Sequence, residues 1–186
     1  MGSAIHSATI KVLVADPPWL IGQAFKTTAA AKHYSLMPDE EILGFQLPEL
    51  ADDAFLFLWR LASRPQLAFE VMKRWGFEYK TEMVWVKTTK PFEKTKRTGD
   101  LPKALLAFGN GHYVRASHET CMIGRRGRAN VKERNVRSVF VAPRSRHSAK
   151  PDEFYKIVET MCEGPYAELF ARTKRQGWEQ YGNELE

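Results

Sequence analysis

The sequence predicts an α/β fold, in which an open sheet is covered by helices on both faces. Three observations lead to this prediction. Short apolar runs alternate with segments of helical periodicity, most of these runs are apolar at every position, and none approaches the length of a membrane span. The chain of 186 residues is 44% hydrophobic and 27% charged, which suits a single domain over residues 1–186.

The first half of the chain predicts two strands and two helices. Residues 9–15 (TIKVLVA) are a short, β-branched apolar run, as in a buried strand. Residues 38–45 open with proline and acidic side chains, as the first turn of a helix does. Residues 54–60 (AFLFLWR) lack polar alternation, which indicates another buried strand. Residues 64–75 repeat apolar side chains at helical spacing, and Gly76 follows as a stop.

The second half predicts four strands and one helix. Residues 79–87 and 119–125 are apolar runs, and 138–143 (SVFVAP) is a third that ends at its proline. Residues 151–162 begin with Pro-Asp-Glu and place apolar side chains on one face, which predicts a helix. Residues 166–172 (YAELFAR) are the sixth predicted strand.

Basic side chains concentrate in two segments. Residues 87–103 have a net charge of +4 and residues 125–146 of +7, whereas the whole chain has +6. The first segment falls in the interval 88–117, where little regular structure is predicted, and long loops in compact domains are usually functional. Basic loops on a mildly acidic body favour contact with a polyanion, although solvated loops are the alternative. The candidate substrate-binding side chains are Lys87, Lys94, Lys96, Arg97, Arg125, Arg126 and Arg128.

The two cysteines, Cys121 and Cys162, are too few and too isolated for a disulfide framework or a zinc site, and no metal site is expected. Both lie in apolar periodic segments, which favours buried thiols in a reducing cytoplasm. The first ten residues lack the long apolar core of a signal peptide. We therefore expect a cytoplasmic protein without a membrane partner.

The first predicted strand ends in Asp16-Pro17-Pro18-Trp19. In open α/β sheets, ligands bind beyond the carboxyl ends of the strands. Consecutive prolines fix the backbone and leave their carbonyls as rigid acceptors. The Asp16 carboxylate and the Pro17 carbonyl would then accept the two hydrogens of an exocyclic amine on a planar ring, with Trp19 stacked on that ring. Adenine and cytosine carry such an amine. The alternative is a strand-ending turn with a tryptophan in the core.

Several segments, in order over nearly the whole chain, resemble the MT-A-type N6-adenine methyltransferases. This family includes the catalytic subunit of the eukaryotic messenger-RNA adenosine methyltransferase. The ending, with its LFAR, GW and GNE, is more similar to bacterial and phage members. The segments are ADPPW (15–19), YSLMPDEEI (34–42), FLFLW (55–59), WGFEYKTEMVWVKT (75–88), GNGHYVRASHETCMIGRRG (109–127), RHSAKPDEFYKIVE (146–159) and AELFARTKRQGWEQYGNEL (167–185).

The resemblance implies a Rossmann-like fold that uses S-adenosylmethionine and is circularly permuted, so that the catalytic motif precedes the cofactor-binding strand. It assigns catalysis to Asp16, Pro17, Pro18 and Trp19. Lys150 matches a lysine that contacts the methionine carboxylate, and a strand-end acid such as Glu168 typically holds ribose hydroxyls. Tyr34 lies near the target base or in the core, and His118 and Glu119 match a family pair. The implied cofactor-binding residues are Asp16, Lys150, Glu168, Phe170, Arg172, Gly182, Asn183 and Glu184.

The implied activity is methylation of adenine N6 in nucleic acid. DNA is favoured over RNA because of the phage-like ending and because no RNA-binding module is added. In duplex DNA the target base must leave the stack. The chain could act as a homodimer or with a related subunit. Three alternatives stay open: a catalytically silent nucleic-acid-binding partner subunit, an RNA adenosine methyltransferase, and a small-molecule N-methyltransferase.

Overall fold

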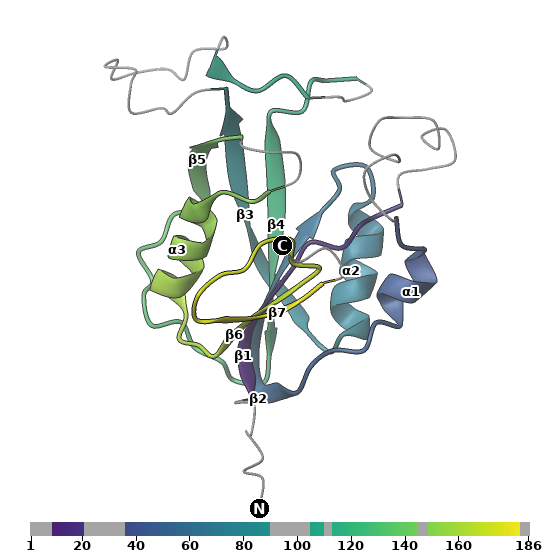
Figure 1. Ribbon diagram of the computed structural model, residues 1–186, viewed down its shortest axis with the longest axis vertical. Helices are drawn as coiled ribbons and strands as arrows, with labels where there is room; N and C mark the ends of the chain where they lie inside the picture. Colours follow the sequence, from purple (N-terminus) through teal and green to yellow (C-terminus); the bar gives the residue numbers. More distant parts are fainter. Residues whose placement is uncertain (1–8, 21–35, 90–104, 110–112, 145–148, 183–186) are drawn as a thin grey trace, which may run out of the picture.

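The computed structural model describes residues 9–20, 36–89, 105–109, 113–144 and 149–182 (Figure 1). Its centre is a seven-stranded sheet with the strand order β5-β3-β4-β2-β1-β6-β7. The fold class expected from the sequence is therefore confirmed as a mixed α/β fold with a curled sheet. The elements, in chain order, are β1 (Ile10–Ala15), α1 (Asp39–Leu43), β2 (Leu50–Arg60), α2 (Pro65–Arg74), β3 (Glu78–Thr88), β4 (His118–Arg126), β5 (Val139–Pro143), α3 (Asp152–Met161), β6 (Tyr166–Leu169) and β7 (Trp178–Tyr181).

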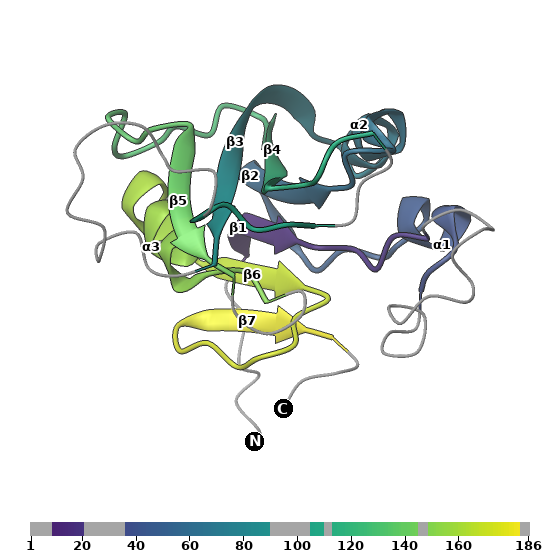
Figure 2. The same cartoon turned by 90° about the horizontal axis from the view of Figure 1, so that it is seen from above.

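One strand of the sheet runs against all the others. Strand β1 lies between β2 and β6 and is parallel to both, β6 is parallel to β7, and β3 is parallel to β5. Strand β4 is antiparallel to both of its neighbours, β2 and β3. The amino end of β4 therefore lies at the same edge as the carboxyl ends of the other strands. The curl of the sheet is visible from above (Figure 2).

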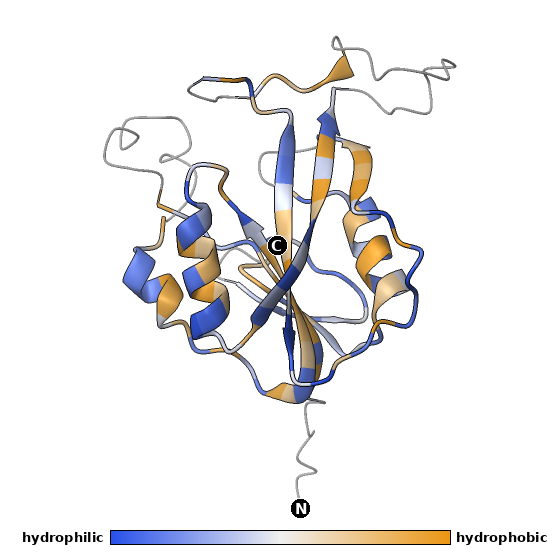
Figure 3. Cartoon of the chain, turned by 180° about the vertical axis from the view of Figure 1, so that it is seen from behind, coloured by the Kyte–Doolittle hydropathy of each residue, from blue (hydrophilic) through white to orange (hydrophobic). Residues whose placement is uncertain are grey.

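Helices cover both faces of the sheet, as the uniformly apolar strands predict. On one face, α1 and α2 pack against Leu13 and Leu56 in the first hydrophobic cluster. On the other face, α3 packs Phe154 against Val12 and Phe57 in a second cluster. Both longer helices carry apolar and polar residues in alternating patches (Figure 3), and the buried ones are the apolar Leu67, Ala68, Val71 and Met72 of α2 and Phe154, Tyr155 and Val158 of α3. No helix in the described part of the chain is long and apolar enough to cross a membrane.

The predicted strands and helices are all present, with different ends in some cases. Strand β2 begins at Leu50, four residues before the apolar run, because its first residues pair with β1. Strand β6 ends at Leu169 rather than at residue 172, since Phe170 has a positive φ of 60° and turns the chain away. Strand β7 was not predicted, because Trp-Glu-Gln-Tyr is short and mostly polar, as an edge strand can be.

Candidate active site

The candidate site lies where the chain leaves the carboxyl end of β1. This strand has parallel neighbours on both sides, and β2 and β6 are reached by different parts of the chain. Ligands of open α/β sheets bind at such a switch point. Asp16 is the first residue after β1, and its side chain is 25% exposed. The sequence-based placement of Asp16 at a strand end is thus confirmed.

The Asp-Pro-Pro-Trp segment is fixed by hydrogen bonds of its own backbone. The Trp19 N–H donates to the Pro17 carbonyl at 2.8 Å, and the Met37 N–H donates to the Pro18 carbonyl at 2.9 Å. A carbonyl oxygen has two lone pairs, so the Pro17 carbonyl can accept one further hydrogen. The Pro17 carbonyl, predicted to be a rigid acceptor, is therefore held in place and has one lone pair left for a ligand.

Trp19 does not present its ring to a ligand. Its side chain is 6% exposed and belongs to the cluster under α1 and α2, and its Nε1–H donates to the Trp59 carbonyl at 3.1 Å. The predicted stacking of Trp19 on a substrate ring disagrees with this position, because the side chain is almost fully buried in the core. The open alternative, a core tryptophan after a strand-ending turn, is the one observed. Trp19 anchors the segment that carries Asp16.

The side chains nearest to Asp16 form a row of alternating charges. The Lys150 ammonium pairs with Asp16 Oδ2 and, at 3.4 Å, with Glu119 Oε2. The other oxygen of Glu119, Oε1, pairs with Lys87. Lys150 is 6% exposed and also lies 5.0 Å above the ring of Trp59. Four separate parts of the fold thus contribute one charge each: the residue after β1, strand β3, strand β4 and the segment just before α3.

The two central groups of the row, Glu119 and Lys150, keep their charges at neutral pH. Burial alone would raise the pKa of Glu119, but the nearby ammonium groups of Lys150 and Lys87 outweigh it, and the pKa is lowered. Burial would likewise lower the pKa of Lys150, but the carboxylates of Asp16 and Glu119 outweigh it, and the pKa is raised. Burial also raises the pKa of the Cys121 thiol well above its usual range, so this cysteine stays a neutral thiol.

Sequence reasoning found Asp16 and Lys150 but gave Glu119 no role beyond a family match. The signal that could have found it is its place at the start of a strand, next to a histidine. Its place in the site could not be predicted, because the sequence of β4 does not show whether the strand is parallel or antiparallel to its neighbours. Lys87, expected to contact substrate, has its ammonium on Glu119 instead and lies 4.8 Å from the Trp85 ring.

The expected cofactor residues at the end of β6 differ in their surroundings. Glu168 is buried, at 8% exposure, and its Oε1 accepts a hydrogen bond from the Tyr155 hydroxyl at 2.6 Å. Its Oε2 accepts from Gln180 Nε2 at 3.4 Å, and burial raises its pKa. Each oxygen thus has one protein donor and one lone pair left, so the prediction that Glu168 holds ribose hydroxyls stays a prediction.

The remaining cofactor candidates lie around the turn that follows β6. Phe170 is half-buried, and its ring packs against that of Phe45 with centroids 4.8 Å apart. Arg172 is half-buried. Gly182 lies against the backbone of Ala171, where an added Cβ would come within 2.2 Å of the carbonyl oxygen. The last two candidates, Asn183 and Glu184, lie outside the described residues, as do Tyr34, Lys94, Lys96 and Arg97.

Three of the predicted substrate-binding arginines lie away from the edge of the sheet that carries Asp16. Arg125 pairs with Phe55 in the middle of β2 and with Glu78, the first residue of β3, and the Arg128 N–H donates to Asp53 at 2.6 Å. Arg126 pairs with Ala54 at the same edge, so β4, which has nine residues, places it about 27 Å along the strand from His118. Arg125, Arg126 and Arg128 therefore lie apart from Asp16, because β4 runs antiparallel. Their predicted contact with a nucleic-acid backbone stays a prediction.

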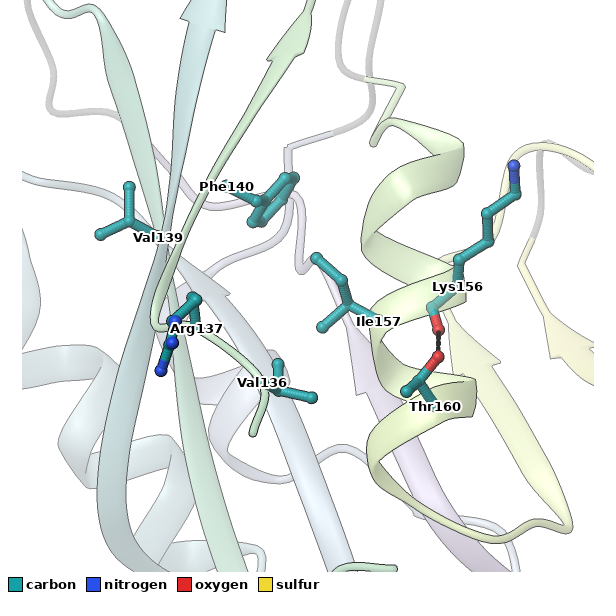
Figure 4. Close-up of a pocket in the computed structure, with 7 residues that line it drawn as sticks. All are labelled: Val136, Arg137, Val139, Phe140, Lys156, Ile157 and Thr160. Atoms are coloured by element: carbon teal, nitrogen blue, oxygen red, sulfur yellow. Dashed lines mark hydrogen bonds between the residues drawn. The ribbon is translucent and has the colours of Figure 1, made fainter. Parts of the chain in front are cut away.

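A shallow apolar depression lies elsewhere, between β5 and α3 (Figure 4). None of the predicted site residues lines it. Its lining residues are Val136, Arg137, Val139, Phe140, Lys156, Ile157 and Thr160.

The described residues fit S-adenosylmethionine in part. A carboxylate beside a rigid carbonyl suits the positive charge carried by a sulfonium, and a lysine next to the first turn of α3 suits a carboxylate. The close approach of Gly182 to the backbone of Ala171 leaves backbone rather than side chain beside the turn that follows β6. Glu168 is the member of the expected set whose oxygens are already partly used, by Tyr155 and Gln180.

Comparison with known proteins agrees with this geometry. The family model described as MT-A70 matches residues 10–184. The chain belongs to the MT-A70 family. The match covers all seven strands, the Asp-Pro-Pro-Trp segment and the row of charges beside it.

Three relatives illustrate the range of the MT-A70 family. The Arabidopsis thaliana N(6)-adenosine-methyltransferase MT-A70-like is 33% identical over 180 residues, which are 95% of this chain and 24% of that protein. The Homo sapiens N(6)-adenosine-methyltransferase catalytic subunit METTL3 is 32% identical over 179 residues, 94% of this chain and 28% of that protein. Type II methyltransferase M.MunI of Mycoplasma sp is 28% identical over 203 residues, 94% of this chain and 77% of that protein. The chain thus spans about a quarter of the plant and human relatives.

Proposed function

We propose that this protein transfers a methyl group from S-adenosylmethionine to N6 of adenine in nucleic acid. The observation that carries the proposal is the Asp16 carboxylate, held by Lys150 through Oδ2 beside the rigid Pro17 carbonyl at the switch point of the sheet. Among the described residues Oδ1 of Asp16 has no ion pair or hydrogen bond. Membership of the MT-A70 family, and the names of the adenosine methyltransferases similar to it, support the same reaction.

The chemistry follows from the two acceptors. The lone pair of the adenine amine is delocalised into the ring, so the nitrogen is a poor nucleophile. Asp16 Oδ1 and the Pro17 carbonyl would each accept a hydrogen bond from one N–H of this amine. The two hydrogen bonds would draw the nitrogen out of conjugation with the ring and direct its lone pair toward the methyl carbon. S-adenosylmethionine, when bound, supplies the electrophilic methyl carbon. The fixed Asp16 carboxylate stabilises the positive charge that develops on the nitrogen without having to reorganise.

The cofactor would lie over the carboxyl ends of β1 and β6. Lys150, at the start of α3, would face its carboxylate end, and the turn formed by Phe170, Arg172 and Gly182 would line its side. Asn183 and Glu184 follow that turn in sequence. Because Trp19 is in the core, the ring that stacks on the target base has to come from another residue, and Tyr34 is our candidate.

We favour DNA over RNA as the substrate, and a bacterial or phage origin. One relative of comparable length is a bacterial type II methyltransferase, and this chain covers 77% of it. The described residues that could meet a nucleic-acid backbone near Asp16 are on the loops at the same edge. Arg144 is exposed after β5, and Arg115 is exposed before β4, 5.0 Å from the ring of Phe108. A second subunit, identical or related, would add further contacts.

The proposal is tested by the identity of the methylated base. The protein is incubated with isotope-labelled S-adenosylmethionine and, separately, duplex DNA, single-stranded DNA and RNA. Each product is then digested to nucleosides. Label on N6 of deoxyadenosine is the expected result, and label only on adenosine would overturn the choice of DNA. Retained nucleic-acid binding without label on any base would show a silent partner subunit. Asp16→Ala is the control for contaminating activity.

A further inference from the structure

We propose that Glu119 is a positioning residue that adds negative charge to the Asp16–Lys150 pair, so that the pair stabilises a positive charge on the substrate amine. We propose further that Lys87 holds Glu119 in place. This inference rests on the proposed methyl transfer. It adds a function for two residues on strands β4 and β3 that touch neither the amine nor the methyl group.

The geometry leaves Glu119 little freedom. Its carboxylate is bound at both oxygens by different cations, Oε1 by Lys87 and Oε2 by Lys150 at 3.4 Å. Residue 119 reaches the site edge only because β4 is antiparallel, so that its second residue lies beside the end of β3. A carboxylate held at both ends cannot turn away when substrate arrives. Lys150 is therefore kept between two carboxylates in one position.

The charges explain why a third group is needed. A lone Asp16–Lys150 pair is neutral and would give little stabilisation to a positive charge that grows on the amine. Glu119 shares the Lys150 ammonium, so the three groups together have one net negative charge. Lys87 lies on the far side of Glu119 and pairs with Oε1, whereas Lys150 pairs with Oε2, so the row of four charges is neutral as a whole but has a carboxylate at the Asp16 end and an ammonium at the Lys87 end. The negative end of the row is therefore the one that faces the amine.

Glu119 also keeps Lys150 protonated. The groups that face Lys150 are Asp16 from β1, Glu119 and the Cys121 thiol from β4, and the Trp59 ring from β2. Burial lowers the pKa of Lys150, and the two carboxylates raise it. Removing the charge of Glu119 would lower this pKa, so that Lys150 loses its proton at a lower pH than in the wild type. Asp16 would then lose its ion-pair partner at that lower pH.

The test compares Glu119→Gln, Glu119→Asp and Lys87→Met with Glu78→Gln, which removes an exposed carboxylate near the other end of β3. We expect Glu119→Gln to lower kcat by about tenfold or more, less than the 10²-fold typical of a direct transition-state contact, with KM little changed. The alkaline limb of its kcat profile should move to lower pH. Glu119→Asp should restore part of kcat and part of the shift in the alkaline limb. Glu78→Gln should leave kcat and the alkaline limb unchanged.

A second readout needs no activity. The Cε carbon of Lys150 is followed by nuclear magnetic resonance during a pH titration of the protein alone, and Lys150→Arg assigns the signal. Its pKa should fall in Glu119→Gln and rise in Lys87→Met, where Glu119 has only Lys150 as a cation. A pKa of Lys150 equal in all variants would overturn the inference, even if methylation were observed. A wild type that labels no nucleic acid would overturn the proposed function while leaving this coupling measurable.

Discussion

Replacing Trp19 by phenylalanine tests whether the indole anchors the segment that carries Asp16. Phenylalanine keeps most of the buried ring but removes the Nε1–H, which donates to the Trp59 carbonyl at 3.1 Å. Loss of a buried hydrogen bond that leaves an acceptor without its donor lowers the free energy of unfolding by about 1–3 kcal/mol. Trp19→Ala should cost about 3–5 kcal/mol, because a ring that is 6% exposed leaves a cavity.

The control for Trp19 is Trp75, which is 5% exposed and donates its Nε1–H to the Ile42 carbonyl at 3.0 Å. It follows α2 near the amino end of β3, far from Asp16. Urea unfolding followed by circular dichroism should give similar losses for Trp19→Phe and Trp75→Phe. Only Trp19→Phe should also lower kcat, since the backbone of Asp16 and Pro17 loses its anchor. Unchanged stability with weaker substrate binding in Trp19→Phe would refute the anchoring role and restore the stacking one.

Three further predictions concern charge. Asp16→Ala should lower turnover at least about 10²-fold in the labelling assay while calorimetry still detects S-adenosylmethionine binding. Burial raises the folded-state pKa of Glu168, so its contribution to stability is complete below about pH 4.3 and is lost as the pH rises. Glu168→Gln should therefore gain stability relative to the wild type between pH 4 and 7 in urea unfolding. Arg144→Ala should lower the salt slope of duplex-DNA binding by about 1, and Arg128→Ala should leave it unchanged, as measured by fluorescence anisotropy.

Much of the sheet could be predicted from the sequence because burial on both faces leaves an unmistakable pattern. Strands such as β1 and β2 carry continuous apolar runs, so their existence follows from composition alone. The position of Asp16 follows in turn, because a carboxylate and two prolines cannot continue a buried strand. Strand β7 could not be predicted in this way, because it lies at the edge of the described sheet, pairs there with β6 alone and needs few apolar side chains.

Side-chain direction was harder to predict than position. Glu168 lies at a strand end, as expected, but alternation along β6 turns it toward α3, where the Tyr155 hydroxyl meets it, while Ala167 and Leu169 face the opposite cluster. Trp19 likewise follows the strand end, yet the turn at Pro17 directs its indole inward. Both outcomes depend on which neighbouring element supplies a hydrogen-bond partner, and that neighbour is distant in sequence.

The direction of one strand decides which charges belong to the site. Residues 118–126 carry an acidic amino end and a basic carboxyl end, and a parallel strand would have brought Arg125 and Arg126 to the edge where Asp16 lies. The antiparallel strand brings Glu119 there instead. Arginines beside Asp16 would oppose a positive charge developing on an amine, whereas Glu119 favours it. The reversal of β4 therefore places a carboxylate beside the reacting nitrogen and keeps the arginines of the same strand away from it.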